Sequence, residues 1–189
     1  MYGLNAGYDS RPMNTGGTDT GIFVSGTEKS AFFQQVAVNA EAVSNDWNFN
    51  AYALLPVGDT EQKLNSYYYG GALNTYGLDV GYFITPAVNA SVGYYYQNGD
   101  LGTADGSGVL GRFSYEMSSG LTAGVSISYD EAFDTRVSAD IKVRFGGAAT
   151  AAKRKEVQQL PVINSLTSTP SNRDVRVHDC HHGHCWPGW

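Results

Sequence analysis

The chain has 189 residues, of which 42% are hydrophobic, 13% are aromatic and only 16% are charged. Ordinary soluble domains contain about 25% charged residues, so this composition favours a membrane β-barrel or a secreted β-protein. The formal net charge of −6 argues against a nucleic-acid partner, because such a partner requires a basic surface. No run approaches the roughly 18 apolar residues of a membrane-spanning helix, which excludes that class of membrane protein.

Eight segments in which apolar and polar residues alternate follow one another along the chain. Each predicts a β-strand with one apolar and one polar face. The most regular is the last, in which Val137, Ala139, Ile141, Val143 and Phe145 alternate with polar residues. Repeated alternating segments of about ten residues predict a transmembrane antiparallel β-barrel. The eight predicted strands span residues 2–9, 31–43, 46–56, 76–84, 87–97, 107–118, 120–130 and 135–146.

Long and short connections alternate between the predicted strands. This alternation is typical of outer-membrane barrels, which have short inner turns and long outer loops. It places both ends of the strand-forming region on the periplasmic side. The connection from Val57 to Thr75 contains Tyr67, Tyr68 and Tyr69. It is either coil or an outer hairpin, and a hairpin would add two strands to the count.

Aromatic residues of the apolar faces gather near the strand ends, whereas the middles carry mostly Ala, Val, Ile and Leu. Two aromatic girdles are typical of barrels in a membrane. The alternative is that aromatic residues are simply common in strands. The expected inner girdle contains Tyr2, Trp47, Tyr82, Tyr115 and Phe145, and the expected outer girdle contains Tyr8, Phe32, Tyr94, Tyr96 and Tyr129.

The polar faces carry charges of both signs, and the apolar faces carry none. Paired carboxylates could perform general acid–base chemistry. No nucleophile, histidine or phosphate-binding loop accompanies them, so we predict a charge-lined lumen and neither a catalytic residue nor a cofactor. The predicted lumen-facing charges are Arg112, Glu116, Asp130, Arg136, Asp140, Lys142 and Arg144.

After Phe145 the alternation stops, so we predict a barrel domain over residues 1–146 and a linker with a mostly irregular tail over residues 147–189. All four His and both Cys lie close together in that tail. Three interpretations stay open: an incidental or disordered tail, a Cys180–Cys185 disulfide, or a Zn²⁺ or Cu site. The candidate metal ligands are His178, Cys180, His182, His184 and Cys185, with His181 among them in sequence.

Four segments carry a resemblance to a known family: LNAGYDSR (4–11), FFQQVAVNAEAVSNDWNFNAYALLPVG (32–58), YGLDVGYFITPAVNASVGYYYQNGD (76–100) and LTAGVSISYDEAFDTRVSADIKVRFG (121–146). Together they resemble the β-domain of inverse autotransporters, the intimin/invasin family of adhesins. The shared motifs are strand–turn patterns such as NxxAYxLxPxG and GxDVGYxxTP.

This resemblance implies an outer-membrane barrel that anchors the protein and translocates its C-terminal continuation, with no cofactor. The implied partners are outer-membrane lipid, the barrel-assembly machinery, and a host or surface ligand bound through a passenger that this chain does not contain. Val143 and Phe145 resemble the C-terminal strand signal read by the assembly machinery; the alternative is an ordinary strand end.

The chain departs from the family in strand number, which is twelve in the family and eight here. An eight-stranded barrel is filled by its own side chains, whereas small residues on the polar faces, such as Gly77, Gly81, Gly93 and Gly124, suit a wider lumen. No signal peptide is visible in the opening MYGLNAGYDS. We therefore expect that the sequence lacks its true N-terminus and is part of a larger barrel.

Three functions remain open on the sequence alone. The first is an outer-membrane anchor and translocation unit of an inverse-autotransporter-like adhesin. The second is a small passive porin or structural barrel, and the third is a soluble secreted β-sandwich that binds partners through Tyr-rich loops. A barrel requires that the apolar faces do not pack together in one core. A C-terminal segment inside the lumen favours translocation over a passive barrel.

Overall fold

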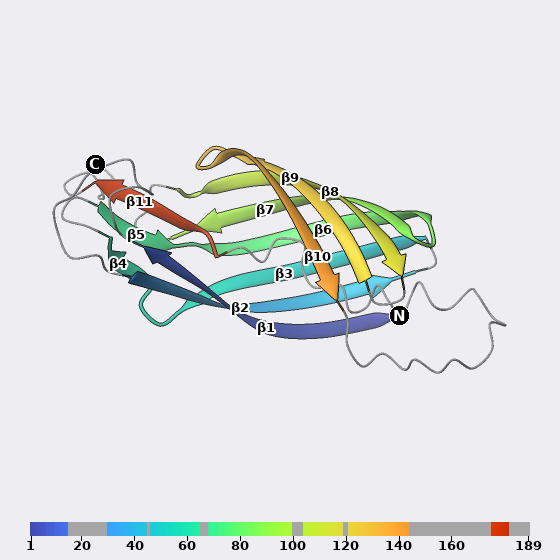
Figure 1. The fold of residues 1–189 in the computed structure, drawn as a ribbon, viewed down its shortest axis with the longest axis horizontal. Coiled ribbons are helices and arrows are strands. Elements are labelled where there is room, and N and C mark those ends of the chain that lie inside the picture. The colour runs from blue at the N-terminus through green and yellow to red at the C-terminus, as the bar shows by residue number, and fades with distance from the viewer. Residues whose placement is uncertain are drawn as a thin grey trace.

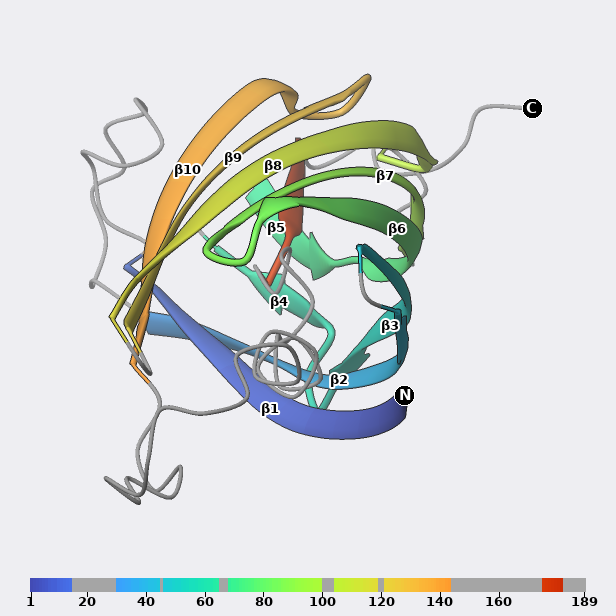
Figure 2. The same cartoon turned by 90° about the vertical axis from the view of Figure 1, so that its right-hand side faces the viewer.

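An eight-stranded antiparallel sheet makes up most of the molecule. The computed structural model describes residues 1–14, 30–44, 46–64, 68–99, 104–118, 121–143 and 175–181. The sheet has the order β1-β2-β3-β6-β7-β8-β9-β10 and curls into a half-barrel with β1 and β10 at its edges (Figures 1 and 2). Its strands are β1 (Tyr2–Asn14), β2 (Ser30–Val43), β3 (Trp47–Val57), β6 (Asn74–Thr85), β7 (Val88–Asn98), β8 (Gly106–Ser118), β9 (Leu121–Asp130) and β10 (Asp134–Val143). The predicted all-β fold is confirmed, and the eight predicted strands correspond to the eight strands of this half-barrel sheet.

A second sheet of three strands lies at the end of the half-barrel where β1 ends and β2 begins (Figure 1). It consists of β4 (Glu61–Lys63), β5 (Tyr68–Ala72) and β11 (Val177–His181), in the order β11-β5-β4. The connection between β3 and β6 is therefore the hairpin alternative, but its strands stay out of the larger sheet. β11 falls in the stretch that the sequence predicts to be mostly irregular. Where the structure describes the chain, no helix is long and apolar enough to cross a membrane.

Apolar side chains face outward from the curl, and polar side chains face inward. Large apolar residues at alternate positions are exposed in every strand of the sheet, for example Leu4 at 85%, Val92 at 69% and Ile141 at 69%. The concave face buries Gln35, Asn39 and Asp79 instead. The apolar faces therefore do not pack together in one core. Among the described girdle residues, all nine are exposed on the convex face: Tyr2, Trp47, Tyr82, Tyr115, Tyr8, Phe32, Tyr94, Tyr96 and Tyr129.

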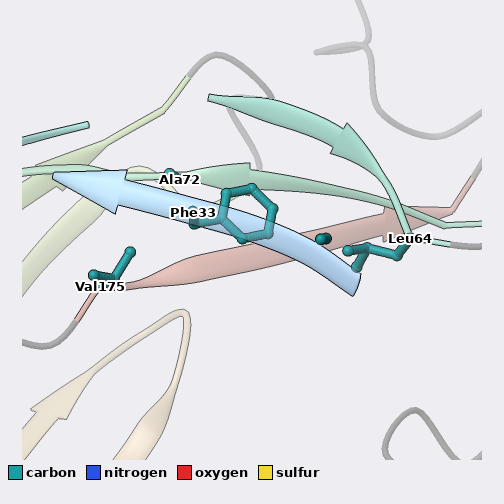
Figure 3. Packing of buried hydrophobic residues seen from close by; sticks show 5 residues of the cluster. Phe33, Leu64, Ala72 and Val175 are labelled. Carbon is teal, nitrogen blue, oxygen red and sulfur yellow. The ribbon is translucent and has the colours of Figure 1, made fainter. Parts of the chain in front are cut away.

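Among the residues that the structure describes, two small apolar clusters lie on the inner side. The larger one joins β2 to the three-stranded sheet through Phe33, Leu64, Ala72 and Val175, together with Ala31 (Figure 3). Phe33 occupies an inward position of β2, next to the outward-facing Phe32, and Leu64 directly follows β4; both are buried. The smaller cluster consists of Ala37, Tyr52 and Leu54. The three-stranded sheet is thus fixed to the half-barrel by a local apolar contact.

Glycines on the concave face accommodate large side chains from the preceding strand. A Cβ atom at Gly77 would overlap the Tyr52 ring, and one at Gly108 would overlap the Tyr95 ring. Each tyrosine stands directly opposite its glycine in the strand register. Similar overlaps would arise between Gly81 and Asn48, between Gly93 and Asp79, and between Gly124 and Arg112. The glycines expected to widen the lumen therefore give their space to neighbouring side chains, which lie along the wall.

Candidate functional site: the concave face and the C-terminal segment

Residues 175–177 bring the C-terminal part of the chain into contact with strands that are far apart in the sheet. Val175 and Arg176 are 3% and 2% exposed. Arg11 Nη1 in β1 donates a hydrogen bond to the Val175 carbonyl oxygen at 3.0 Å. On the other side, the Leu73 amide donates to the Arg176 carbonyl oxygen at 3.0 Å. Viewed along the curl, β11 lies within the outline of the eight-stranded sheet (Figure 2).

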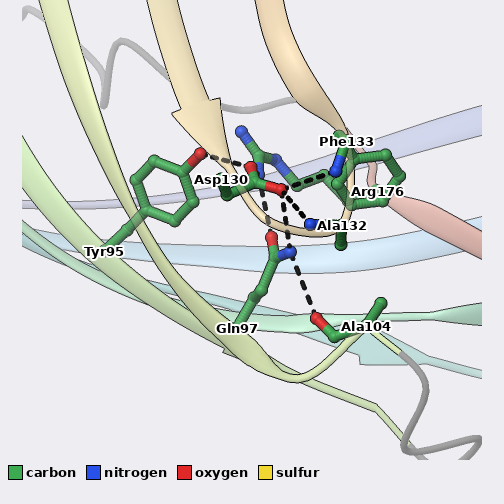
Figure 4. Close-up of polar contacts among 7 residues, drawn as sticks. All are labelled: Tyr95, Gln97, Ala104, Asp130, Ala132, Phe133 and Arg176. Carbon is green, nitrogen blue, oxygen red and sulfur yellow. Dashed lines mark hydrogen bonds and ion pairs between the residues drawn. The ribbon is translucent and has the colours of Figure 1, made fainter.

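The Arg176 guanidinium is held by a buried polar network on the concave face (Figure 4). Its Nη1 atom donates to Gln97 Oε1 and to Asp130 Oδ2, each at 2.8 Å. Its Cζ atom lies 4.5 Å from the centroid of the Tyr95 ring and 5.6 Å from that of Phe133. The guanidinium therefore has a carboxylate partner, an amide partner and two aromatic faces.

Apart from Arg176, the residues of this network belong to the large sheet and its turns. Tyr95 and Gln97 are two positions apart on β7, so both side chains point to the concave face. The Tyr95 hydroxyl donates to Asp130 Oδ2 at 2.5 Å. Asp130 ends β9, and its Oδ1 accepts the amide of Phe133 at 2.8 Å in the turn to β10. Gln97 Nε2 donates to the Ala104 carbonyl oxygen at 3.2 Å. The acceptors for Arg176 are thus oriented by groups of the wall.

Charge pairing explains why such groups tolerate burial. The side chains of Arg176 and Asp130 are 2% and 1% exposed. An unpaired buried ion costs several kcal/mol in real proteins, whereas a well-oriented pair with further hydrogen bonds recovers much of that cost. Tyr95 and Phe133 add cation–π contacts, each contributing about 0.5–2 kcal/mol. Removing either charge therefore leaves its partner buried and uncompensated.

A second ion pair lies along β8, β9 and β10. Arg112 Nη1 and Nη2 donate to Asp140 Oδ1 and Oδ2 at 2.5 and 3.0 Å, and Nη1 also reaches Ser126 Oγ at 3.0 Å. The arginine side chain is 8% exposed, and the aspartate side chain is 36% exposed. This bidentate contact crosses β9 and joins β8 to the edge strand β10.

The other predicted lumen-facing charges occupy alternate positions on the same face. Glu116 and Lys142 both stand opposite Thr122 in the register, on either side of β9. Arg136 stands opposite the buried Ser128. Arg144 lies outside the described residues, as does Phe145. Glu116 on β8 and Lys142 on β10 are therefore opposite charges on the two sides of β9.

Two of the five predicted metal ligands lie among the described residues. His178 and Cys180 belong to β11, where their backbones pair with Gly71 and Tyr69. His182, His184 and Cys185 lie outside the described residues. Within the described ranges, no group of three or more His, Cys, Asp or Glu side chains could hold a metal ion. The metal site and the Cys180–Cys185 disulfide both stay predictions.

Sequence reasoning identified Asp130 as a lumen-facing charge but missed Arg176, Tyr95, Gln97 and Phe133. A local signal for Arg176 exists, because Val175 and Val177 flank it in an alternating pattern. The pattern is too short to predict a strand by itself. Comparison with protein-family models, with curated proteins and with solved structures found no match.

Proposed function

We propose that this chain is an outer-membrane β-barrel domain that serves as the anchor and translocation unit of an inverse-autotransporter-like surface adhesin. The observation that carries this proposal is the position of residues 175–181. They lie at the opposite end of the half-barrel from Met1 and from the end of β10, and Arg176 is buried on the concave side (Figure 1). A C-terminal segment held there is what a translocation unit requires and what a passive barrel does not.

The convex face supports the membrane part of the proposal. Exposed apolar side chains of neighbouring strands stand opposite one another, such as Val80 and Val92, and form an apolar band across the sheet. Monomeric proteins in water rarely expose one apolar patch of more than about 300–600 Å². In lipid the same band is the favourable surface, and girdles of Tyr and Trp suit the two interfaces. Outer-membrane lipid is therefore the proposed partner of this face.

The paired strands support the same setting. A bilayer core supplies no water to satisfy backbone amides and carbonyls, so spanning segments must pair them internally. Each neighbouring pair in the eight-stranded sheet forms an antiparallel ladder, such as the thirteen-residue pairing of β1 with β2, with register shifts near Ile84 and Met117. β1 and β10, at the two edges of the sheet, each have one neighbour in it. Folding such strands into an outer membrane calls on the barrel-assembly machinery, which is the second proposed partner.

A soluble β-sandwich fits the molecule poorly. In a sandwich, two sheets bury their apolar faces against each other, with polar residues outward. In this chain the large sheet has the reverse distribution, and its apolar positions are the exposed ones. The second sheet contacts the first through the small cluster around Phe33 and Leu64 and through hydrogen bonds such as the one that Gln62 Nε2 donates to the Phe32 carbonyl oxygen at 2.7 Å, so no extended apolar face of the large sheet is covered by it.

Protease shaving of whole cells tests the translocation part. The chain is expressed behind a cleavable export signal, with an epitope tag after Trp189. We expect external protease to remove the tag from intact cells, because the segment emerges on the outer side. As a control, a tag inserted in the turn between Pro86 and Ala87, at the opposite end of the strands, should resist until the membrane is opened. Protection of the C-terminal tag in intact cells would contradict the proposal.

A further inference from the structure

The network around Arg176 joins two kinds of recognition in one place. The backbone of β11 adds to the edge of β5, with Val177 opposite Ala72 and His181 opposite Tyr68. One residue before β11, the Arg176 side chain enters the wall network of Tyr95, Gln97 and Asp130. Backbone pairing of this kind provides affinity for any extended segment, and side-chain pockets provide selectivity.

We infer that Tyr95, Gln97, Asp130 and Phe133 form an arginine-selective docking site for an extended strand that adds to β5, and that the chain's own segment 175–181 is its occupant. The biological meaning of this site rests on the proposed function, in which it fixes the position where the C-terminal segment is held. These four residues would hold the segment at this position, a detail that the proposed function does not specify.

Selectivity for arginine follows from the geometry of the guanidinium. One nitrogen serves Gln97 Oε1 and Asp130 Oδ2 at 2.8 Å each, while the planar group lies 4.5 Å from the Tyr95 ring centroid. A lysine ammonium is a compact, strongly hydrated charge that cannot stack as a plane while it donates to both acceptors. An apolar residue would leave Asp130, which is 2% exposed, without its cationic partner.

The site is built from two separate parts of the large sheet. Asp130 and Phe133 belong to the β9–β10 turn, whereas Tyr95 and Gln97 belong to β7. The Arg11 side chain and the Leu73 amide each donate a hydrogen bond to a main-chain carbonyl of the segment, at Val175 and at Arg176. The backbone pairing with β5 and these two hydrogen bonds hold any extended segment, and the guanidinium adds the contact that distinguishes arginine.

Disulfide trapping measures occupancy of the site. Cysteines replace Ala72 and Val177, which stand opposite each other, in a chain that carries Cys180→Ser and Cys185→Ser. A matched control pair replaces Ala51 and Leu78, which stand opposite each other on the convex face. The control reports an intact large sheet and does not involve the segment. Both pairs are oxidised in purified full-length protein in detergent micelles, so the result does not depend on export.

We expect Arg176→Ala and Asp130→Asn to slow trapping of the segment about tenfold, since each removes a charge-assisted hydrogen bond from a buried pair. Arg176→Lys should slow it nearly as much, and Glu131→Gln, a change at the exposed neighbouring residue, should not slow it. Trapping of the control pair should stay unchanged in all four variants.

Three results would overturn the inference in different ways. Trapping in Arg176→Lys at the rate of the parent chain would remove the arginine selectivity. Loss of the control pair in that variant would make Arg176 a part of the fold and not of a docking site. Disulfide-linked dimers as the main product would replace the intramolecular occupant with the segment of a second copy. A failure of protease shaving or membrane insertion leaves this assay unaffected, so the two proposals fail separately.

Discussion

Glycines on the concave face decide where the large inward side chains lie. Each accepts a tyrosine, an amide or a charged group from the neighbouring strand, so that the side chain runs along the wall. The pairing of a tyrosine with an opposite glycine also pins the strand register. At Gly108, a residue with a Cβ would displace the Tyr95 ring, so packing at this position affects the hydrogen bond between Tyr95 and Asp130.

Gly108→Ala should destabilise the fold by about 1–3 kcal/mol, as is usual when a methyl group is forced into a packed site. The new Cβ would meet the Tyr95 ring, whose hydroxyl donates to Asp130 at 2.5 Å. Gly106→Ala is the matched control, because nothing lies within 4 Å of its added Cβ. Urea unfolding in lipid vesicles measures both, and equal stabilities for the two variants would refute the packing account.

Arg112→Ala should lower the free energy of unfolding by about 1–3 kcal/mol, since it removes the bidentate partner of Asp140. The loss stays below that of a fully buried pair, because the Asp140 side chain is 36% exposed. Lys63→Ala serves as the control, since its ammonium lies 5.9 Å from the Tyr69 ring centroid at an exposed site. Unfolding in urea, followed by tyrosine and tryptophan fluorescence, gives both values. An unchanged midpoint for Arg112→Ala would show that β10 is held by its backbone ladder alone.

At the scale of strands, alternation of apolar and polar residues was enough to predict the large sheet. Alternation did not predict every strand end or the three short strands of the second sheet. β1 continues to Asn14, beyond the predicted end, because Pro12 is tolerated on an edge strand that has a free side. β4 and β5 have three and five residues, which is too short for a period of two to be recognised. β11 pairs with a strand about a hundred positions earlier in the sequence, and no local pattern specifies such a partner.

The candidate site was predictable to a smaller extent. Asp130 follows from its place on a polar face, whereas Arg176 lies in a stretch whose composition predicts a tail. The two residues meet through a tertiary contact across 46 positions. The inner positions of Tyr95 and Tyr52 have a similar origin. Alternation with the outward Tyr94 and Tyr96 predicts that Tyr95 points inward, but the partner glycine of each tyrosine is specified only by the strand register.

Val92→Arg tests whether the convex face lies in lipid or in water. Val92 lies in the middle of β7 and is 69% exposed, so the change removes little packing. In lipid, an arginine near the midplane costs about 2–4 kcal/mol. In water, a change at an exposed site usually stays within about 0.5 kcal/mol.

Thr135→Arg is the matched control for Val92→Arg. Thr135 is exposed at the start of β10, beside Tyr129 of the outer girdle, where an arginine in lipid costs about 0–1 kcal/mol. The stability difference between the two variants in vesicles, from urea titration, is the measured quantity. Equal stabilities would place the convex face in water.

At the scale of the whole molecule, one property organises the rest: the sheet is apolar outside and polar inside. Transfer of an apolar outer face from water into lipid lowers the free energy of the protein. A polar inside gives the C-terminal segment groups to bind, and the Arg176 network uses them. The three-stranded sheet at one end then extends the wall to receive the segment as an added strand. In the proposed function, anchoring and retention therefore depend on the two opposite faces of the same strands.

The most direct test of this account is the location of the exported chain after cell fractionation. The chain, expressed behind an export signal, should sediment with the outer membrane and stay there through a wash in alkaline carbonate or urea. In detergent it should migrate faster on gels when unheated than when boiled, because the folded sheet resists unfolding. A monomer that remains in the soluble fraction and needs no detergent would contradict the central claim that the apolar convex face lies in lipid.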